Sequence, residues 1–384
     1  MGAVHHVMDA LRLLVVVILG VLAGAVRLLP GVLVHLARAA MGLEKRTVGP
    51  LPPRDGRRPV RFTSEALLGA GSGFIDAAVE SRGEGEESAA VRIHLVEDDG
   101  EMRIEDDGQQ LPPLVFVHGF PGLWLEWEQQ LRFFREAGHR VVAVSLRGYG
   151  ESDRPEGVER YRMGRLVEDI AAAVEHASTG FPDGGRRKPL LVAHDWGAAV
   201  CWAYSLRSGR ESICGYVALS VPPSRLFMRA LGRSLRQMYS SLYILFFMVP
   251  VLPELAFGGR DAWLTGLSLS SSVKEPDARL IEACRRNMMA SCTPALNYYR
   301  AMLLPQAAGR GGAARQGDGG DGKAPFPILM IRGEEDVALT AAVFEGYQDE
   351  LGPNARLLSI RNCSVRPRAT SVRAPCVRPA RALH

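Results

Sequence analysis

Short apolar runs alternate with helix-like stretches from about residue 90 onward. The expected strands are Val91–Val96, Leu114–His118, Arg140–Leu146, Pro189–Ala193, Gly215–Ser220, Pro327–Ile331 and Arg356–Ile360. The expected helices are Trp127–Ala137, Arg162–Ala177 and one that begins at Gly197. Short apolar strands separated by helices of this length are typical of a mostly parallel sheet with helices on both faces. The pattern therefore predicts an α/β fold.

The alternation stops between Pro222 and about Leu304, where the pattern is helical and Met, Leu and aromatic residues are frequent. We predict a helical lid over residues 223–305, above the carboxyl ends of the strands, where α/β sheets bind ligands. Residues 306–325 are low in complexity and are expected to form a flexible loop. The sheet domain then consists of residues 89–222 and 326–364.

The N-terminal segment, residues 1–43, carries a membrane signal. Leu13–Val26 is an unbroken apolar run that is too short alone to cross a bilayer, and Leu28–Ala37 extends it beyond Arg27. A span requires the Arg27 side chain to reach the interface, because an arginine at mid-bilayer costs roughly 2.5–3.5 kcal/mol. More basic residues follow the run than precede it, which favours an anchor in the endoplasmic reticulum membrane with the main body in the cytosol. The alternative is a cleaved targeting peptide. Residues 44–88, which contain prolines and a Gly-Glu run, are expected to form a tether that is ordered in places.

Composition narrows the classes of partner. The formal net charge is +4, but residues 365–384 contain five arginines and no acid, so the rest of the chain carries −1. No basic surface for a nucleic acid is therefore expected. The six cysteines form no CxxC pair, and no group of residues has the spacing of metal ligands. We expect neither a metal nor another cofactor.

Candidate chemistry lies at a turn between a strand and a helix, Ala193–Ala198. The nucleophile elbow of α/β-hydrolases needs small residues around the nucleophile because the turn is tight, and Ala193, Gly197 and Ala198 satisfy this. The nucleophile position holds Asp195 rather than serine, and the chain contains no G-x-S-x-G. Asp195 could equally be a simple helix N-cap, so the turn alone leaves both interpretations open.

A second element favours the nucleophile. His118, Gly119, Phe120 and Pro121 follow an earlier strand, as an oxyanion loop should. The backbone N–H groups of Phe120 and Trp196 are expected to converge on the carbonyl oxygen of an acylated Asp195 and so form an oxyanion hole. We expect His118 itself to be structural rather than a base.

The chain resembles the epoxide hydrolases of the α/β-hydrolase fold, close to the membrane-anchored vertebrate type, over about residues 90–364. The matching segments are His118–Pro121, Arg147–Asp153, His194–Ala198, Leu296–Arg300 and Gly333–Asp336. The resemblance implies the α/β-hydrolase fold, with the lid inserted after the sixth strand.

The resemblance also implies the roles of four side chains. Asp195 would attack an epoxide carbon and form an alkyl-enzyme ester. Tyr243 and Tyr299, which match the lid tyrosines of the family, would hydrogen-bond the departing alkoxide. Asp336 matches the acid that holds the histidine base for hydrolysis of the ester by water. The partners would be water and a small lipophilic epoxide, such as an epoxy fatty acid or an arene oxide.

The sequence departs from this family at the base. A histidine is expected soon after Arg361–Ser364, but the chain continues with an Arg- and Pro-rich tail, residues 365–384, that has no helical period. We expect the usual C-terminal helix to be lost. Of the nine histidines only His384 lies beyond Asp336, at a Pro-broken terminus. The first half-reaction is therefore expected to run and the second to stall.

Two other functions remain open. Haloalkane and haloacid dehalogenases share the Asp elbow and the covalent ester, but two lid tyrosines suit an alkoxide better than a halide. A catalytically inactive binding protein would retain the hydrophobic pocket without turnover, and the missing histidine favours this alternative.

Overall fold

The structure is a computed structural model, and it describes residues 71–80, 89–99, 110–207, 209–271, 277–304, 323–361 and 363–364. Three of the expected segments lie outside these residues: the anchor at 1–43, most of the loop at 306–325 and the tail at 365–384. The expected loss of the C-terminal helix concerns the same tail. Among the described residues, no helix has the length and apolar character needed to span a bilayer.

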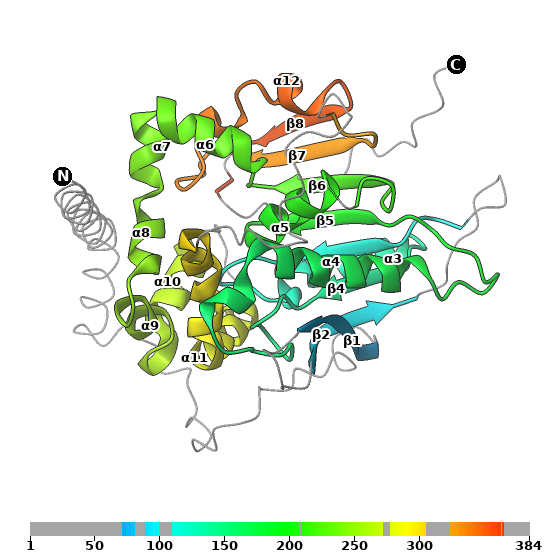
Figure 1. Cartoon of the computed structure of the whole chain (residues 1–384), viewed down its shortest axis with the longest axis horizontal. Coiled ribbons are helices and arrows are strands. Elements are labelled where there is room, and N and C mark those ends of the chain that lie inside the picture. Colours follow the sequence, from blue (N-terminus) through cyan, green and yellow to red (C-terminus); the bar gives the residue numbers. More distant parts are fainter. Residues whose placement is uncertain are drawn as a thin grey trace, which may run out of the picture.

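Eight strands of the described chain form one sheet (Figure 1). In spatial order they are β1 (Gly71–Glu80), β2 (Ala89–Asp98), β4 (Val141–Val144), β3 (Leu114–Val117), β5 (Leu190–His194), β6 (Gly215–Leu219), β7 (Ile328–Gly333) and β8 (Ala355–Ile360). The β1–β2 and β2–β4 pairs are antiparallel, and every other pair is parallel. The predicted mostly parallel sheet is confirmed.

One ordered stretch lies within the expected tether. Gly71–Glu80 is strand β1 and pairs along its length with β2. The sequence did not predict that this stretch is a strand of the sheet. The two glycines of this stretch weaken the strand signal, and the strand forms because its backbone groups find partners on β2.

The central strands owe their place to their apolar sequence. The side chains of β3 and β4 are all buried, as is expected of parallel strands that are covered on both faces. The covering helices of the sheet domain are α3 (Glu128–Glu136), α4 (Met163–Ser178), α5 (Trp196–Ser205) and α12 (Tyr347–Leu351), with short 3-10 helices at Trp124–Trp127, Val158–Tyr161 and Ala341–Phe344. Helix α4 packs on α5 and β3, and it crosses the front of the sheet in Figure 1.

The predicted lid follows β6, the sixth strand along the chain, and is confirmed as helical. It contains α6 (Ser224–Arg233), α7 (Leu235–Ser240), α8 (Leu242–Met248), α9 (Leu252–Phe257), α10 (Trp263–Ser271) and α11 (Ala278–Arg300), with 3-10 turns at Arg260–Ala262 and Ala301–Leu303. Helices α7 to α11 lie beyond one end of the sheet, at the left of Figure 1.

A buried ion pair in the sheet domain holds the loop that contacts the lid. Arg147, after β4, donates to both carboxylate oxygens of Asp169 on α4, at 2.9 and 2.7 Å, and both side chains are almost completely buried. The backbone oxygen of Arg147 accepts a hydrogen bond from the hydroxyl of Tyr298 on α11. The same loop contacts α11 twice more, where Asn287 accepts from Gly150 N and Arg154 donates to the Ser291 hydroxyl. The position of α11 therefore depends on the loop that the ion pair holds.

Removal of one partner tests this dependence. Asp169→Ala leaves the Arg147 guanidinium buried without its counter-ion, which should lower the free energy of unfolding by about 3–5 kcal/mol. Equilibrium urea unfolding measures the change. Arg186→Ala, which breaks a solvent-exposed pair with Glu175, is the control and should have no measurable effect. A loss of less than about 1 kcal/mol in Asp169→Ala would contradict the central role of the pair.

Candidate active site

Asp195 occupies a strained turn between β5 and α5. Its backbone has φ 50° and ψ −123°, a conformation that residues other than glycine seldom adopt. The following turn is equally tight, because a Cβ at Gly197 would lie 2.4 Å from the backbone oxygen of His118. The small residues predicted around Asp195 are thus required by the approach of two backbone segments.

Two backbone N–H groups converge on one carboxylate oxygen of Asp195. Phe120 N donates to Oδ2 at 2.8 Å and Trp196 N donates to the same atom at 2.6 Å. The loop can come this close because residue 119 is glycine: a Cβ there would lie 2.4 Å from the Asp195 Cβ. No described residue donates a hydrogen bond to Oδ1, and the side chain keeps partial solvent exposure. The two oxygens of Asp195 therefore differ, because both N–H donors lie on Oδ2.

The remaining residues of this loop support it. Nδ1 of His118 lies 3.0 Å from Gly119 O, and Nε2 accepts a hydrogen bond from Leu146 N at 3.1 Å. A ring that donates at one nitrogen and accepts at the other is neutral and held by backbone groups. This arrangement fits the expected structural role of His118. Pro121 is buried directly behind Phe120.

The lid brings its two candidate tyrosines to the same place. The ring of Tyr299, on α11, lies 5.0 Å from the Trp196 ring and 5.6 Å from the Phe120 ring. The ring of Tyr243, on α8, lies 6.5 Å from that of Tyr299. Burial and the nearby Asp195 carboxylate hold the pKa of Tyr299 well above its usual value. The hydroxyl therefore stays protonated and can donate a hydrogen bond at any ordinary pH.

Asp336 lies beyond the end of β7, within electrostatic reach of Asp195. Its Oδ1 accepts hydrogen bonds from Ala338 N at 2.8 Å and Leu339 N at 2.9 Å. Its Oδ2 is buried and has no hydrogen-bond partner among the described residues. Burial raises the pKa of this carboxyl above its ordinary value, although the two backbone N–H groups act in the opposite direction. The oxygen that would hold a histidine base therefore lacks a partner within the described chain.

The sequence did not single out Glu126, which is buried close to Asp195. Its Oε1 lies 3.3 Å from Nδ1 of His194, the residue before Asp195. Burial raises the pKa of the Asp195 carboxyl, and Glu126 adds to that rise while His194 and the two N–H groups oppose it. An acid near the start of an expected helix is common on protein surfaces, so no sequence signal marked Glu126 as buried.

Aromatic side chains form the apolar wall of the site. The ring of Phe120 lies 5.0 Å from Phe247 on α8 and 5.3 Å from Phe257 on α9, and Phe247 lies 4.8 Å from Tyr299. The carboxylate thus lies beneath rings contributed by the loop and by three lid helices.

A glutamine ties the lid to the loop that carries Asp336. Gln237, on α7, is completely buried, and its amide nitrogen donates to Ala338 O at 2.9 Å. Its amide oxygen accepts hydrogen bonds from both the backbone nitrogen and the hydroxyl of Thr340. The first part of the lid and the Asp336 loop are therefore joined by hydrogen bonds. In the described residues, no three His, Cys, Asp or Glu side chains are grouped as metal ligands.

Comparison with known proteins agrees with the observed fold. A family model described as the alpha/beta hydrolase fold matches residues 112–349. Epoxide hydrolase 3 of Xenopus tropicalis is 27% identical over 289 residues, which cover 69% of this chain and 72% of that protein. Epoxide hydrolase 3 of Mus musculus is 36% identical over 251 residues, which cover 61% of this chain and 60% of that protein. A crystal structure of Bacillus megaterium epoxide hydrolase with an inhibitor superimposes with a TM-score of 0.59 at 25% identity, covering 76% of this chain and 93% of that one.

The buried oxygen of Asp336 gives a testable pH dependence. A carboxyl whose pKa is higher in the folded chain than in the unfolded chain destabilises the fold as the pH rises through the folded pKa. We expect Asp336→Asn to raise the urea midpoint at neutral and alkaline pH, and the gain to shrink towards acid pH, where both forms are uncharged. Urea unfolding across pH, followed by tryptophan fluorescence, measures this difference.

The exposed Asp349→Asn is the matched control for Asp336→Asn and should leave the midpoint unchanged. A lower urea midpoint for Asp336→Asn at neutral pH would show that Oδ2 has a partner outside the described residues. That result would contradict the interpretation of Asp336 as an unpaired acid.

Proposed function

We propose that this chain, a member of the alpha/beta hydrolase fold family and of its epoxide hydrolases, opens an epoxide by attack of Asp195 and then retains the product as an ester. The observation that carries the proposal is the pair of N–H groups on Oδ2 of Asp195 beneath two lid tyrosines. Asp195, the two N–H groups and the two lid tyrosines are the groups that formation of the ester would need. The second half requires a base, for which the described residues offer no candidate in contact with Asp336.

The first step forms one bond and breaks another. Oδ1 of Asp195 attacks an epoxide carbon, and a C–O ester bond forms while the ring C–O bond breaks. The electron pair of the broken bond goes to the ring oxygen. Oδ2 becomes the ester carbonyl oxygen, still held by Phe120 N and Trp196 N. The carboxylate need not rotate to react, because the oxygen that stays behind is the one already bound.

The two tyrosines stabilise the oxygen that departs. An alkoxide is a poor leaving group unless a donor protonates it or hydrogen-bonds to it strongly. Tyr243 and Tyr299 lie on the lid side of Asp195, and burial keeps the Tyr299 hydroxyl protonated. We assign the larger effect to Tyr299, because its ring contacts the rings of both residues that supply the N–H groups, Phe120 and Trp196.

The second step needs a water molecule and a base to activate it. Water would add to the ester carbonyl, and the negative charge on Oδ2 would be stabilised by the same two N–H groups. The unpartnered Oδ2 of Asp336 would hold a neutral base, such as an imidazole, and would stabilise the cation that forms when this base takes the proton from water. His194 is not that base in this scheme, because its side chain is buried against Glu126 and makes no hydrogen bond to Oδ2 of Asp336. The alkyl-enzyme ester is therefore expected to accumulate.

The substrate we propose is a small lipophilic epoxide. The walls around Asp195 are aromatic rings, which favour an apolar or arene-bearing molecule. Membrane association through residues 1–43, at the endoplasmic reticulum with the site towards the cytosol, would supply such molecules. That location remains a prediction from the apolar run and the basic residues after it.

Incubation with styrene oxide tests the first half-reaction. We expect the full-length protein to gain the mass of one epoxide, located on the peptide that contains Asp195, with less than one diol released per chain. Intact and peptide mass spectrometry with diol quantification measures both. Asp195→Asn should form no adduct. Adduct on other residues alone would refute the assignment of the nucleophile.

The tyrosines affect the rate of the same step. Tyr299→Phe should slow formation of the ester by about 10²-fold, since a positioned acid contributes typically that much or more. Tyr347→Phe, a partly exposed tyrosine on α12, is the control and should leave the rate unchanged. An unchanged rate in both Tyr243→Phe and Tyr299→Phe would contradict a role of these two hydroxyls in opening the epoxide ring.

An external base should restore the second half-reaction. Imidazole is small enough to act as a free base, and the unpaired Oδ2 of Asp336 offers it an acceptor. We expect diol release to begin when imidazole is added and to rise with its concentration, and Asp336→Ala to weaken this rescue. Multiple-turnover diol release without imidazole would show that the chain supplies its own base, with His384 as the first residue to substitute.

A catalytically inactive binding protein is the second candidate. The buried, unpartnered Oδ2 of Asp336 favours it, because a catalytic acid without a base cannot complete the reaction. Tight retention of a lipophilic epoxide with neither adduct nor diol would support this function over the enzymatic one.

A further inference from the structure

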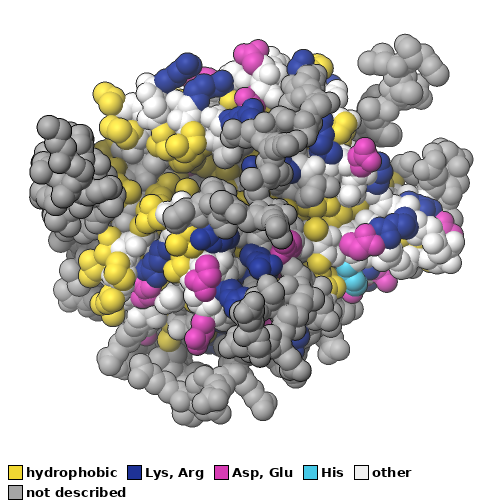
Figure 2. Space-filling model, viewed as in Figure 1, with side chains coloured by type: hydrophobic (Ala, Val, Ile, Leu, Met, Phe, Trp, Pro, Cys, Tyr) yellow, Lys and Arg dark blue, Asp and Glu magenta, His cyan; other side chains and the backbone are white. Residues whose placement is uncertain are grey.

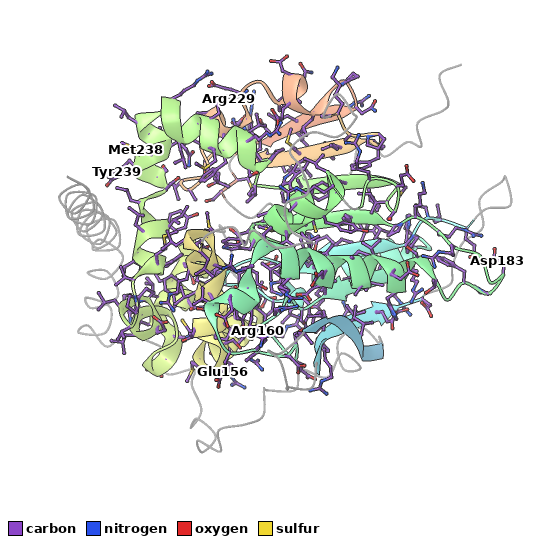
Figure 3. The ribbon with its side chains drawn as sticks, viewed as in Figure 1. Glu156, Arg160, Asp183, Arg229, Met238 and Tyr239 are labelled. Carbon is purple, nitrogen blue, oxygen red and sulfur yellow. The ribbon has the colours of Figure 1, made fainter. Side chains whose placement is uncertain are left out.

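The lid exposes a set of large apolar side chains on its outer surface. We call these residues the lid face: Met228, Leu235, Met238, Tyr239, Val251, Leu252 and Leu255. Leu235 is 79% exposed, and Val251 and Leu255 are each more than 60% exposed. In Figure 2 hydrophobic side chains gather at the left end of the molecule, over the lid helices, and Figure 3 places Met238 and Tyr239 there. Clusters of this kind mark an interaction site more often than single exposed apolar residues do.

The same segment is basic. Between Pro222 and Pro253 the sequence has four arginines and no acid. Arg225 pairs with Glu350, and Arg229 donates to the backbone oxygen of Glu345. Arg233 and Arg236 are exposed and make no ion pair with a described residue. Positive charge therefore stands unneutralised beside the apolar side chains.

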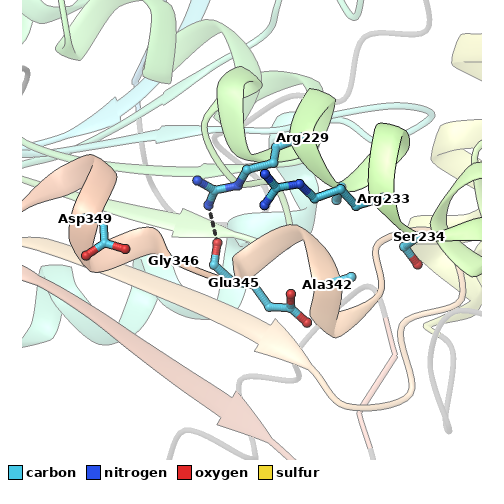
Figure 4. Close-up of a pocket in the computed structure, with 8 residues that line it drawn as sticks. Arg229, Arg233, Ser234, Ala342, Glu345, Gly346 and Asp349 are labelled. Carbon is cyan, nitrogen blue, oxygen red and sulfur yellow. Dashed lines mark hydrogen bonds between the residues drawn. The ribbon is translucent and has the colours of Figure 1, made fainter.

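A neighbouring pocket accounts for part of this charge. It has a volume of about 390 Å³ and lies between α6 and the segment from Ala342 to Asp349 (Figure 4). Arg229 and Arg233 line one side, and Glu345 and Asp349 line the other. The charges of the pocket balance, so it favours neither an anion nor a cation. Arg236, on α7, neither lines this pocket nor pairs with a described acid, and it stands beside Leu235 and Met238.

We propose that the lid face docks on the surface of an anionic lipid bilayer. Exposed Leu, Met and Tyr side chains flanked by arginines are the combination that inserts into the headgroup region of a membrane. Arginines without a partner are attracted to the negative surface of acidic lipids. A protein partner with an acidic rim would match the charge as well, but Leu13–Val26 independently indicates that this chain meets a bilayer. The lid face would be a second membrane contact, separate from the N-terminal segment.

Hydrogen exchange on the full chain tests this docking. The protein is compared in solution, with phosphatidylcholine vesicles, and with vesicles that also contain phosphatidylserine. We expect amides of residues 234–256 to exchange severalfold more slowly with the anionic vesicles only, while amides of α4 stay unchanged. The double variant Leu235→Glu, Met238→Glu should lose the protection. The control is Phe133→Glu, an exposed apolar residue on α3, which should keep it.

Each alternative covering of the lid face gives a different result. Equal exchange with and without anionic vesicles, despite protein binding to them, would overturn the proposal and leave the N-terminal segment as the membrane contact. Protection in solution that grows with protein concentration would point to a second copy. The readout does not depend on the epoxide reaction, so the two proposals can fail separately.

A second double variant, Arg233→Gln with Arg236→Gln, tests the contribution of charge. It should reduce the protection of residues 234–256 by anionic vesicles.

Discussion

The absence of a Cβ at two glycines determines how the site is built. At Gly119 a Cβ would collide with the Asp195 side chain, and at Gly197 it would collide with the backbone beside His118. With a side chain at either position, the loop that carries Phe120 and the turn that carries Asp195 could not pack this closely. The N–H groups of Phe120 and Trp196 could then not reach the same oxygen. The unusual backbone at Asp195 persists because this close packing leaves it no alternative.

The lid depends on a different kind of constraint. Helix α11 carries Tyr299, and its neighbour Tyr298 is hydrogen-bonded to the backbone of Arg147, whose guanidinium is neutralised by Asp169. The ring of Tyr299 is thus positioned by a charge pair in the sheet domain. Within the lid, Arg300 makes two hydrogen bonds to Glu254, which fixes α9 against the end of α11. Polar contacts therefore fix the positions of α9 and α11, whose apolar side chains cover Asp195.

The sequence allowed the sheet, the lid and the position of Asp195 to be predicted because each has a local signal. Apolar runs mark the strands, and small residues mark the elbow. Strand β1 escaped prediction because its glycines weaken the pattern and its stability comes from pairing with β2. Glu126 escaped because burial of an acid depends on what folds over it, here the strand end that carries His194. The position of Asp336 was predictable, but its unpaired oxygen was not, since this depends on which groups surround the loop.

The contacts of Gln237 restrict how the lid can move. Its amide group spans from α7 to the loop after β7, and separation of the two would leave a buried amide and the Thr340 N–H without partners. Motion that lifts α7 is therefore costly, whereas α8 and α9 meet the loop at Phe120 through ring contacts alone. Opening of the lid should pivot on α7 and widen on the side of Phe247 and Phe257. A substrate would then enter past these two rings, and the geometry of Asp336 would stay undisturbed while it does so.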